Sequence, residues 1–326
     1  LLVQLVHSFL VVVLAVTVSV VYFITGNWIL DRWSAKSNTP KAEKIRPWIF
    51  LFPALFLISL YLLYPAFETL RLSFFNNSGR EFVGMQNYLW LFQDEQMRTT
   101  LRNNFLWLII VPLLSTFFGL IIATLSDRVW WGAFAKTLVF MPMAISFVGA
   151  SVIWKFIYDL RSTDADQIGL LNAIVVALGG EPMAWITIPF WNNFFLMVVL
   201  IWIQTGFAMV ILSAALRGLS NEVIEASRMD GANEFQIFYK IMVPQILPTI
   251  IVVWTTITVI VLKVFDIVVA MTNGQWDTGV LANLMFDWMF RAADFGRGST
   301  IALMILLGVI PIMYLNIKRL KQEDEI

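Results

Sequence analysis

Long apolar stretches separated by short polar ones dominate the sequence. Seven of them are about 18 to 29 residues long, enough for a helix to cross a bilayer. They lie at about residues 1–29, 48–67, 105–125, 137–158, 190–212, 246–271 and 300–317. A shorter apolar run at 168–178 predicts a helix lying along the membrane surface. The pattern therefore predicts an all-α polytopic membrane protein with about seven transmembrane helices.

Composition agrees with this class and excludes others. Of the 326 residues, 59% are hydrophobic and 13% are charged, which excludes an ordinary soluble domain. The formal net charge is zero, so no nucleic-acid partner is indicated, and membrane lipid is the partner that the composition predicts. With no cysteine and a single histidine, His7, the chain lacks the residues for a disulfide, a thiolate metal site or a histidine cluster.

The first apolar stretch is predicted to be a membrane span rather than a signal peptide. No basic residue precedes it, and no small-residue cleavage pattern follows it. The chain starts at Leu1 rather than at Met, which suggests that a few residues are missing before it. The polar, basic stretch 31–47 then predicts a cytoplasmic linker to the second span.

The distribution of Lys and Arg predicts the orientation, because cytoplasmic segments of membrane proteins are enriched in these residues. Thirteen lie in the linker, the third-to-fourth loop, the loop after the fifth span and the C-terminal tail, whereas seven lie in the three alternate loops. The first set is therefore predicted to be cytoplasmic. This places the N-terminus outside the cell and the C-terminus inside it.

A polar, helix-forming stretch separates the fifth and sixth spans, with the sequence EASRMDGANEFQIFYKIMVPQILP at 225–248. Before it, Ser220 and Asn221 can accept hydrogen bonds from free amide groups, so a helix is predicted to begin there. Gly231 is suited to end that helix in a left-handed conformation, and Asn233 is suited to start a second one. Two short helices joined by a glycine elbow are therefore predicted.

The same stretch resembles the signature loop of binding-protein-dependent ABC importer permeases. That family has E-A-A-x-x-D-G-A followed by I-x-L-P, and this chain has E-A-S-x-x-D-G-A from Glu225 and I-x-V-P from Ile241. The departures are Ser227 for the second Ala and Val243 for Leu. The sequence F-V-G-M-Q-N-Y at 82–88 is also similar to the F-V-G-L-x-N-Y of sugar permeases in that family.

The resemblance implies a six-helix type I ABC importer core preceded by one extra span. The implied divisions are an extra N-terminal helix at 1–30, the linker at 31–47, a permease domain at 48–318 with a cytoplasmic coupling loop at 217–248, and a tail at 319–326. In that family the first helix of the loop docks into a cleft on an ATPase subunit. The implied ATPase-coupling residues are Glu222, Glu225, Ala226, Ser227, Asp230, Gly231 and Ala232.

Partners and location follow from the resemblance as well. It implies a second homologous permease, two cytoplasmic ATPase subunits that bind ATP and Mg, an extracytoplasmic solute-binding protein and a bacterial plasma (inner) membrane. The sequence contains no G-x-x-x-x-G-K-[ST], H-E-x-x-H or G-x-S-x-G motif. The chain is therefore predicted to be a transport subunit, not an enzyme, with no cofactor of its own.

Candidate residues for the solute path lie in the fifth and sixth spans. Ionisable residues inside a span mark function by default, and Lys263 and Asp266 are predicted to share a helix face. There they either line the path or pair near the outer interface. The full candidate set is Trp202, Gln204, Thr205, Trp254, Thr255, Thr258, Lys263, Phe265 and Asp266. For any single aromatic residue among them, lipid contact or helix packing is the more common role.

The end of the sixth span narrows the expected cargo. K-V-F-D-I-V at 263–268 followed by M-T-N-G at 271–274 resembles alpha-glucoside-type permeases, a group similar to maltose permeases and glucosylglycerol importers. The implied cargo is a small neutral glycoside, with alpha-glucosides, trehalose-like sugars and glucosylglycerol as candidates. In maltose permeases this span carries asparagines that contact the sugar, but Val261 and Val264 stand at the corresponding positions here. The sugar contacts of maltose permeases therefore cannot be assigned to residues of this chain.

Three alternatives remain open. The same ABC architecture could carry glycerol phosphate or a polyamine, although an anionic solute needs a basic lining and only Lys263 offers one. An ion-coupled secondary transporter needs no ATPase but leaves the signature loop unexplained. A membrane enzyme or assembly factor would lack any catalytic motif. Co-purification with an ATPase separates the ABC architecture from the other two classes.

Overall fold

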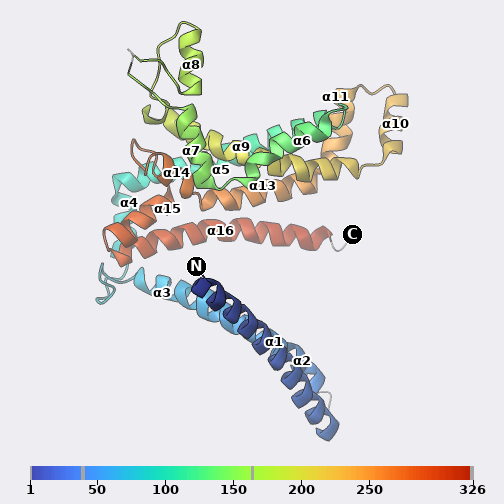
Figure 1. Cartoon of the computed structure of the whole chain (residues 1–326), viewed down its shortest axis with the longest axis vertical. Helices are drawn as coiled ribbons and strands as arrows, with labels where there is room; N and C mark the ends of the chain where they lie inside the picture. The colour runs from blue at the N-terminus through green and yellow to red at the C-terminus, as the bar shows by residue number, and fades with distance from the viewer. Residues whose placement is uncertain (1, 38–40, 163–164, 324–326) are drawn as a thin grey trace. The chain divides into compact units, whose positions relative to one another are not determined.

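The computed structural model describes residues 2–37, 41–162 and 165–323. These residues form helices joined by turns, with one isolated antiparallel β-bridge between Phe75 and Phe82. The predicted all-α class is therefore confirmed. The chain divides after Glu68 into two compact units (Figure 1).

The first unit is a helical hairpin. Its helices are α1 (Leu2–Ser37) and α2 (Lys41–Ile58), which continues through a π-helical turn, η1 (Ser59–Leu63), into α3 (Tyr64–Leu72). The Tyr22 hydroxyl donates to the Ile49 carbonyl at 2.5 Å, and the rings of Phe23 and Phe50 lie 5.3 Å apart. Most large apolar side chains of the hairpin are exposed, as expected for helices that meet lipid.

The second unit contains the remaining helices. Its longer helices are α4 (Gln86–Gln93), α5 (Glu95–Ser126), α6 (Gly132–Phe140), α7 (Phe147–Ile157), α8 (Leu170–Ala177), α9 (Trp191–Arg217), α10 (Asn221–Met229), α13 (Leu247–Leu262) and α16 (Phe295–Glu323). Its shorter helices are η2 (Met141–Ala144), η3 (Trp185–Thr187), α11 (Glu234–Ile237), η4 (Phe238–Met242), α12 (Val243–Gln245), α14 (Asp266–Met271), α15 (Leu281–Phe286) and η5 (Asp287–Arg291).

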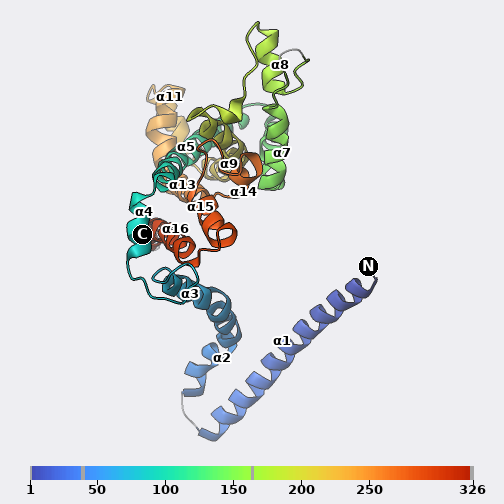
Figure 2. The same ribbon diagram turned by 90° about the vertical axis from the view of Figure 1, so that its left-hand side faces the viewer.

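Helices α5, α9 and α13 pack on one another, and α16 packs on α13. Within this unit, α10 and α11 lie at one end and α4 and α15 lie at the other (Figure 1). Helix α8 projects away from the other helices of the unit in both views (Figure 1, Figure 2). It covers most of the apolar run at 168–178, so the helix predicted there is confirmed.

The contact between α5 and α9 is close because small residues meet there. A Cβ added at Gly119 would lie 2.5 Å from the Cβ of Ala208 and 2.8 Å from the backbone nitrogen of Met209. Small residues of this kind let helix backbones approach each other in membranes, where no hydrophobic effect drives the helices together. Large side chains such as Trp107 and Leu200 are buried along the same two helices.

Four predicted spans are confirmed by helices that are long and apolar enough to cross a membrane. They are His7–Arg32, Lys44–Leu72, Glu95–Ser126 and Trp191–Arg217. The third starts at Glu95, well before the predicted 105, because Asp94 caps its first turn by accepting a hydrogen bond from the Met97 amide at 2.8 Å. The seventh predicted span lies in α16, which includes the apolar stretch Phe295–Pro311.

The predicted fourth and sixth spans are not single helices. The chain bends by 107° between η2 and α7, so the continuous span predicted at 137–158 is wrong. Ile145 and Ser146 are extended there, and the Ser146 hydroxyl accepts a hydrogen bond from the Gly149 amide at 3.0 Å to start α7. The predicted span 246–271 is also interrupted, because α13 ends at Leu262 and α14 begins only at Asp266.

The predicted linker 31–47 is helical at both ends, since α1 runs to Ser37 and α2 starts at Lys41. Its central residues 38–40 lie outside the described residues, as do residues 324–326 of the predicted tail. The rest of that tail continues α16 as far as Glu323.

The close contact of α5 and α9 generates the first testable prediction. Gly119→Val should reduce the stability of the purified protein by about 1–3 kcal/mol, because the added atoms overlap the α9 backbone. Gly308→Ala on α16 is the control, since its Cβ would lie an ordinary 3.5 Å from the nearest side-chain atom. Thermal unfolding in detergent measures both variants, and an unchanged midpoint for Gly119→Val would contradict the packing described here.

Candidate functional site

The segment between α9 and α13 holds two short helices joined by a sharp turn. Helix α10 ends in a left-handed Gly231 with a φ of +83°. The Gly231 amide donates to the Arg228 carbonyl and the Ala232 amide to the Ser227 carbonyl, both at 3.0 Å. This pair of bonds closes the helix as a Schellman motif. The predicted glycine elbow is therefore confirmed.

Asn233 starts the second helix through reciprocal hydrogen bonds. Its side-chain oxygen accepts from the Gln236 amide at 2.8 Å, and the Gln236 side chain accepts from the Asn233 amide at 2.9 Å. The predicted restart at Asn233 is confirmed. Helix α10 begins at Asn221 after Ser220, as predicted, but the Ser220 side chain makes no capping bond.

Most of the predicted coupling residues form the exposed outer surface of this elbow. Helix α10 has no buried residue. The exposed members of the predicted set are Glu222, Glu225, Ala226, Asp230 and Gly231, and the half-buried ones are Ser227 and Ala232. The Ser227 hydroxyl donates to the carbonyl of Val223 in its own helix at 2.6 Å. The exposed side of α10 is thus available to a partner.

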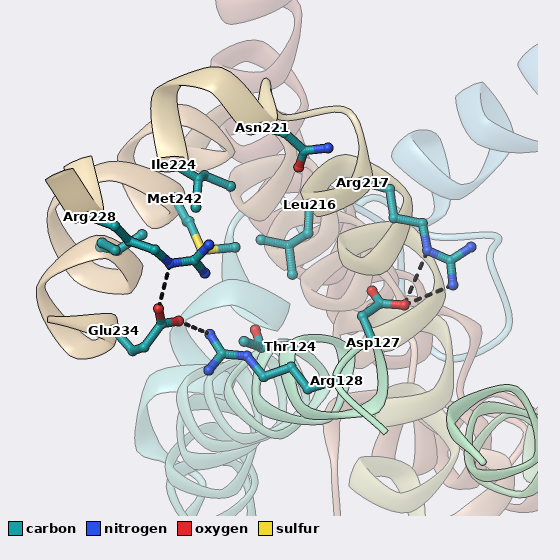
Figure 3. A pocket seen from close by; sticks show the side chains of 11 residues that line it. Thr124, Asp127, Arg128, Leu216, Arg217, Asn221, Ile224, Arg228, Glu234 and Met242 are labelled. Carbon is teal, nitrogen blue, oxygen red and sulfur yellow. Dashed lines mark hydrogen bonds and ion pairs between the residues drawn. The ribbon is translucent and has the colours of Figure 1, made fainter. Parts of the chain in front are cut away.

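Glu234 joins α10 to the turn after α5. One oxygen of its carboxylate accepts from Arg228 Nε at 2.9 Å, and the other lies 3.0 Å from Nη2 of Arg128 (Figure 3). Arg228 is in the last turn of α10 and Arg128 is in the turn between α5 and α6. The two ion pairs therefore connect the elbow to a transmembrane helix.

Asp127 anchors a second ionic cluster beside the first. Lys136 Nζ on α6 lies 2.7 Å from its carboxylate. Arg217 at the end of α9 donates to it from Nη2 at 2.9 Å and from Nε at 3.2 Å (Figure 3). Ser213 donates to its other oxygen at 3.2 Å. Partial burial alone would raise the Asp127 pKa, but the hydrogen bonds from Lys136 and Arg217 outweigh it and lower the pKa below its usual value. Asp127 therefore stays ionised at neutral pH and ties α5, α6 and α9 together.

A pocket of about 290 Å³ opens between these two clusters. Figure 3 shows Leu216, Asn221, Ile224 and Met242 around it, with the Glu234 ion pairs on one side. The arrangement can transmit a displacement of α10, because one wall belongs to the elbow and the other to α5 and α9. Among the described residues, no group of three or more His, Cys, Asp or Glu side chains could hold a metal ion.

The sequence patterns did not identify Asp127, Arg128, Lys136 and Glu234 as site residues. Arg128 and Lys136 entered only the Lys and Arg count that predicts the orientation. A usable clue was the Asp-Arg pair placed directly after a long apolar stretch, where isolated charges are costly. Their partners, however, are distant in the sequence: Arg217 lies 90 positions from Asp127, and Glu234 lies farther still from Arg128. No local pattern reveals such pairs.

Most of the predicted path residues in the regular helices are buried or make hydrogen bonds and ring contacts within the protein. Gln204 and Thr205 on α9 are buried. The hydroxyls of Thr205, Thr255 and Thr258 each donate to a carbonyl four residues earlier, at 2.7 to 2.8 Å. Trp202 packs edge-on against Trp154 with ring centroids 5.9 Å apart, and Trp254 on α13 is half-buried.

The structure separates the predicted charge pair in the sixth span. Lys263 caps the end of α13, Asp266 opens α14, and Phe265 lies between them in a non-helical conformation. The spacing rule for one helix face therefore does not apply, and the ion pairs of the described residues do not include this pair. Both charged side chains are exposed, and Lys263 and Phe265 line a pocket of about 330 Å³ with Phe286.

Comparisons with known proteins agree with the signature loop. Residues 115–317 match the family model of the binding-protein-dependent transport system inner membrane component. The chain is 62% identical to the alpha-glucoside transport system permease protein AglF of Rhizobium meliloti (strain 1021), over 98% of each chain. It is 52% identical to the osmoprotective compounds uptake permease protein GgtC of Synechocystis, over 85% of this chain and 100% of that one.

A solved structure supports the fold. A bacterial ABC transporter involved in the import of the acidic polysaccharide alginate contains a chain that matches with a TM-score of 0.72. The match covers 85% of this chain and 98% of that chain at 19% sequence identity.

The Glu234 ion pairs generate a prediction about the mobility of α10. Glu234→Gln removes the charge that holds Arg228 and Arg128, while the amide keeps the side-chain shape. Because exposed ion pairs add little to global stability, the melting temperature should hardly change. Amide hydrogen exchange should nevertheless become faster across α10, since its own residues provide no buried anchor.

Glu222→Gln on the same helix is the matched control, and its exchange should equal that of the wild type. Equal exchange rates in α10 for Glu234→Gln and the wild type would mean that the ion pairs do not hold this helix.

Proposed function

The chain belongs to the family of binding-protein-dependent transport system inner membrane components, and we propose that it forms the solute path of an ATP-driven importer for a small neutral glycoside. It is a multi-pass permease of the inner membrane. The observation that carries the importer mechanism is the exposed α10 elbow, which is tied by ion pairs to the helices behind it. Its candidate cargoes are alpha-glucosides, trehalose-like sugars and glucosylglycerol.

The names of two relatives support this cargo class. One is a permease of an alpha-glucoside transport system, and the other takes up osmoprotective compounds. The described helices add an electrostatic reason, because Lys263 and Asp266 contribute one charge of each sign near the break after α13. A lining of this kind gives no net attraction for an anion, which disfavours glycerol phosphate.

The partners of the complex are a second homologous permease, two ATPase subunits that bind ATP and Mg, and an extracytoplasmic binding protein. The sequence has no phosphate-binding loop of its own, so the energy must come from another chain. The elbow faces the cytoplasm, with the C-terminus inside and the N-terminus outside. The excess of Lys and Arg in these segments supports that orientation.

Coupling begins at the exposed acidic surface of α10, where Glu222 and Glu225 contact an ATPase subunit. Closure of the ATPases displaces α10, and the Glu234 carboxylate carries this displacement to the turn after α5 through Arg128. The Asp127 cluster then moves α6 and α9 with α5. The solute path opens alternately to each side as these helices reorient.

We place the path itself between α9, α13 and the break that follows α13. Its candidate lining is the set Trp202, Gln204, Thr205, Trp254, Thr255, Thr258, Lys263, Phe265 and Asp266. The transporter core then comprises residues 48–318, and residues 1–30 add one further span before the linker 31–47.

The direct test is ATP hydrolysis by the complex that co-purifies with this chain, in lipid discs with its binding protein. A panel of alpha-glucosides, trehalose and glucosylglycerol should contain at least one compound that stimulates hydrolysis through the binding protein. Hydrolysis that responds to no saccharide would refute the glycoside cargo but keep the importer. The absence of any ATPase from the complex would refute the importer itself.

Gly231→Pro tests the elbow. Proline fixes φ near −65°, which is incompatible with the +83° of Gly231, so the helix end cannot close. Uptake should be largely lost while the ATPase subunits continue to hydrolyse ATP. Gly179→Pro is the matched control, because Gly179 is also left-handed, at φ +82°, and also has open space around it. Normal uptake by Gly231→Pro would exclude a coupling role for the elbow.

A further inference from the structure

The turn between α14 and α15, residues 272–280, concentrates backbone strain. Asn273, Trp276 and Asp277 have positive φ values of 54°, 54° and 61°. Such values are uncommon for any residue except glycine, and for a bulky residue such as Trp they are true outliers. Gly274 shares this region at +77°, and a Cβ there would lie 2.0 Å from a neighbouring side chain. Strain of this kind persists only where the surroundings enforce it, and it gathers at ligand contacts and switches.

Three buried asparagines enforce this conformation. Asn103 on α5 donates from Nδ2 to the Asp277 carbonyl at 2.6 Å and to a second carbonyl of the turn at 2.9 Å. On α9, Asn192 donates to the Trp276 carbonyl at 2.6 Å, and Asn193 donates to the Asp277 carbonyl at 3.4 Å. All three asparagines are at most 1% exposed, so water does not compete for these bonds. These three residues are hereafter the asparagine clamp.

The clamp binds main-chain atoms and leaves the side chains of the turn free to contact something else. Gln275, Trp276 and Asp277 are consecutive and exposed, and 46% of the Trp276 surface is accessible. The strain continues on the clamp side, where Phe190 directly precedes α9 with a φ of 67°. The hydrogen bond between Asn192 and Trp276 thus joins two segments with unfavourable backbone conformations, one at Phe190 and the other at Trp276.

We propose that Gln275, Trp276 and Asp277 form a saccharide-contacting tip at the outer end of the permease, positioned by the asparagine clamp. This proposal rests on the glycoside transport function given above. A pyranose ring has an apolar C–H face that packs on an indole, and its hydroxyls bond to amides and carboxylates such as those of Gln275 and Asp277. A tip that is already rigid loses little entropy when it binds.

The location of the turn 272–280 is consistent with a contact to the saccharide as it enters the permease. Within the second unit, α15 lies at the end opposite to α10 (Figure 1). If α10 faces the cytoplasm, the turn faces the side from which the solute arrives. An exposed Trp can also anchor a protein at the membrane–water boundary. A tryptophan that only anchors the protein in the membrane needs neither a left-handed backbone nor hydrogen bonds from three buried asparagines to its turn.

The test uses the whole complex in lipid discs with its binding protein, loaded with trehalose or glucosylglycerol or left empty. For Trp276→Ala, capture of the empty binding protein should be unchanged. Uptake and ATP hydrolysis stimulated by the loaded protein should fall by about tenfold, the scale of one lost aromatic contact. Trp276→Phe should restore most of the activity because it restores a flat apolar ring.

Two further variants test the clamp and the specificity of the effect. Asn192→Leu keeps a similar volume but removes the donor to Trp276, so the loaded-protein response should fall as in Trp276→Ala. Asn172→Leu is its control, because Asn172 is a buried amide that binds the carbonyls of Asp159 and Met183 in a different loop. Trp130→Ala, at a residue that is 96% exposed, controls for the loss of a surface tryptophan.

Three results would overturn the proposal. Equal weakening of empty and loaded binding-protein capture would assign Trp276 to a protein interface. Unchanged activity, or a lower yield alone, would assign it to the membrane boundary. A wild-type complex that responds to none of the glycosides would refute the transport function first and this proposal with it.

Discussion

The close pairing of α5 and α9 is the constraint on which the second unit depends. Asn103 in the first half of α5 and Asn192 at the start of α9 bind the turn 272–280, and both helices end beside Asp127, which Arg217 binds. They therefore run parallel, and they touch at Gly119 and Ala208 with no room for a side chain between them. A larger residue at Gly119 would separate the two helices and disturb both ends at once.

The two ends of the α5–α9 pair are held by different kinds of interaction, buried hydrogen bonds at one end and half-exposed ion pairs at the other. Beside the turn 272–280, buried amides hold a strained backbone, and buried hydrogen bonds are costly to leave unsatisfied. That end is consequently stiff. Beside α10, the contacts of Glu234 are ion pairs between half-exposed side chains. Pairs in water are weak and can be exchanged at little cost, so this end can adjust its position relative to a moving partner.

The elbow was predictable from the sequence, whereas the breaks in the spans were not. Gly231 and Asn233 act on their immediate neighbours, so their residue types and spacing define the turn. The bend before α7 occurs within largely apolar sequence, where composition gives little sign of a break. The interruption after α13 does coincide with two charged residues, Lys263 and Asp266, but their spacing equally fits one face of a continuous helix. The asparagine clamp and the Asp127 cluster depend on partners distant in the chain, and adjacent polar residues at the ends of apolar stretches give no indication of which partner they meet.

The interruption after α13 bears on where the solute passes. The hydroxyls of Thr205, Thr255 and Thr258 donate hydrogen bonds to carbonyls of their own helices, so these residues present only a weakly polar surface to a solute. Lys263 and Asp266 differ, because both are exposed at the ends of broken helices. A charged side chain that faces lipid carries a large free-energy penalty. Contact with a second permease or with a water-filled path would remove this penalty. Broken helices at membrane depth are likewise tolerated where they line a cavity. The two charges and the break therefore favour the same place for the path, beside Phe265.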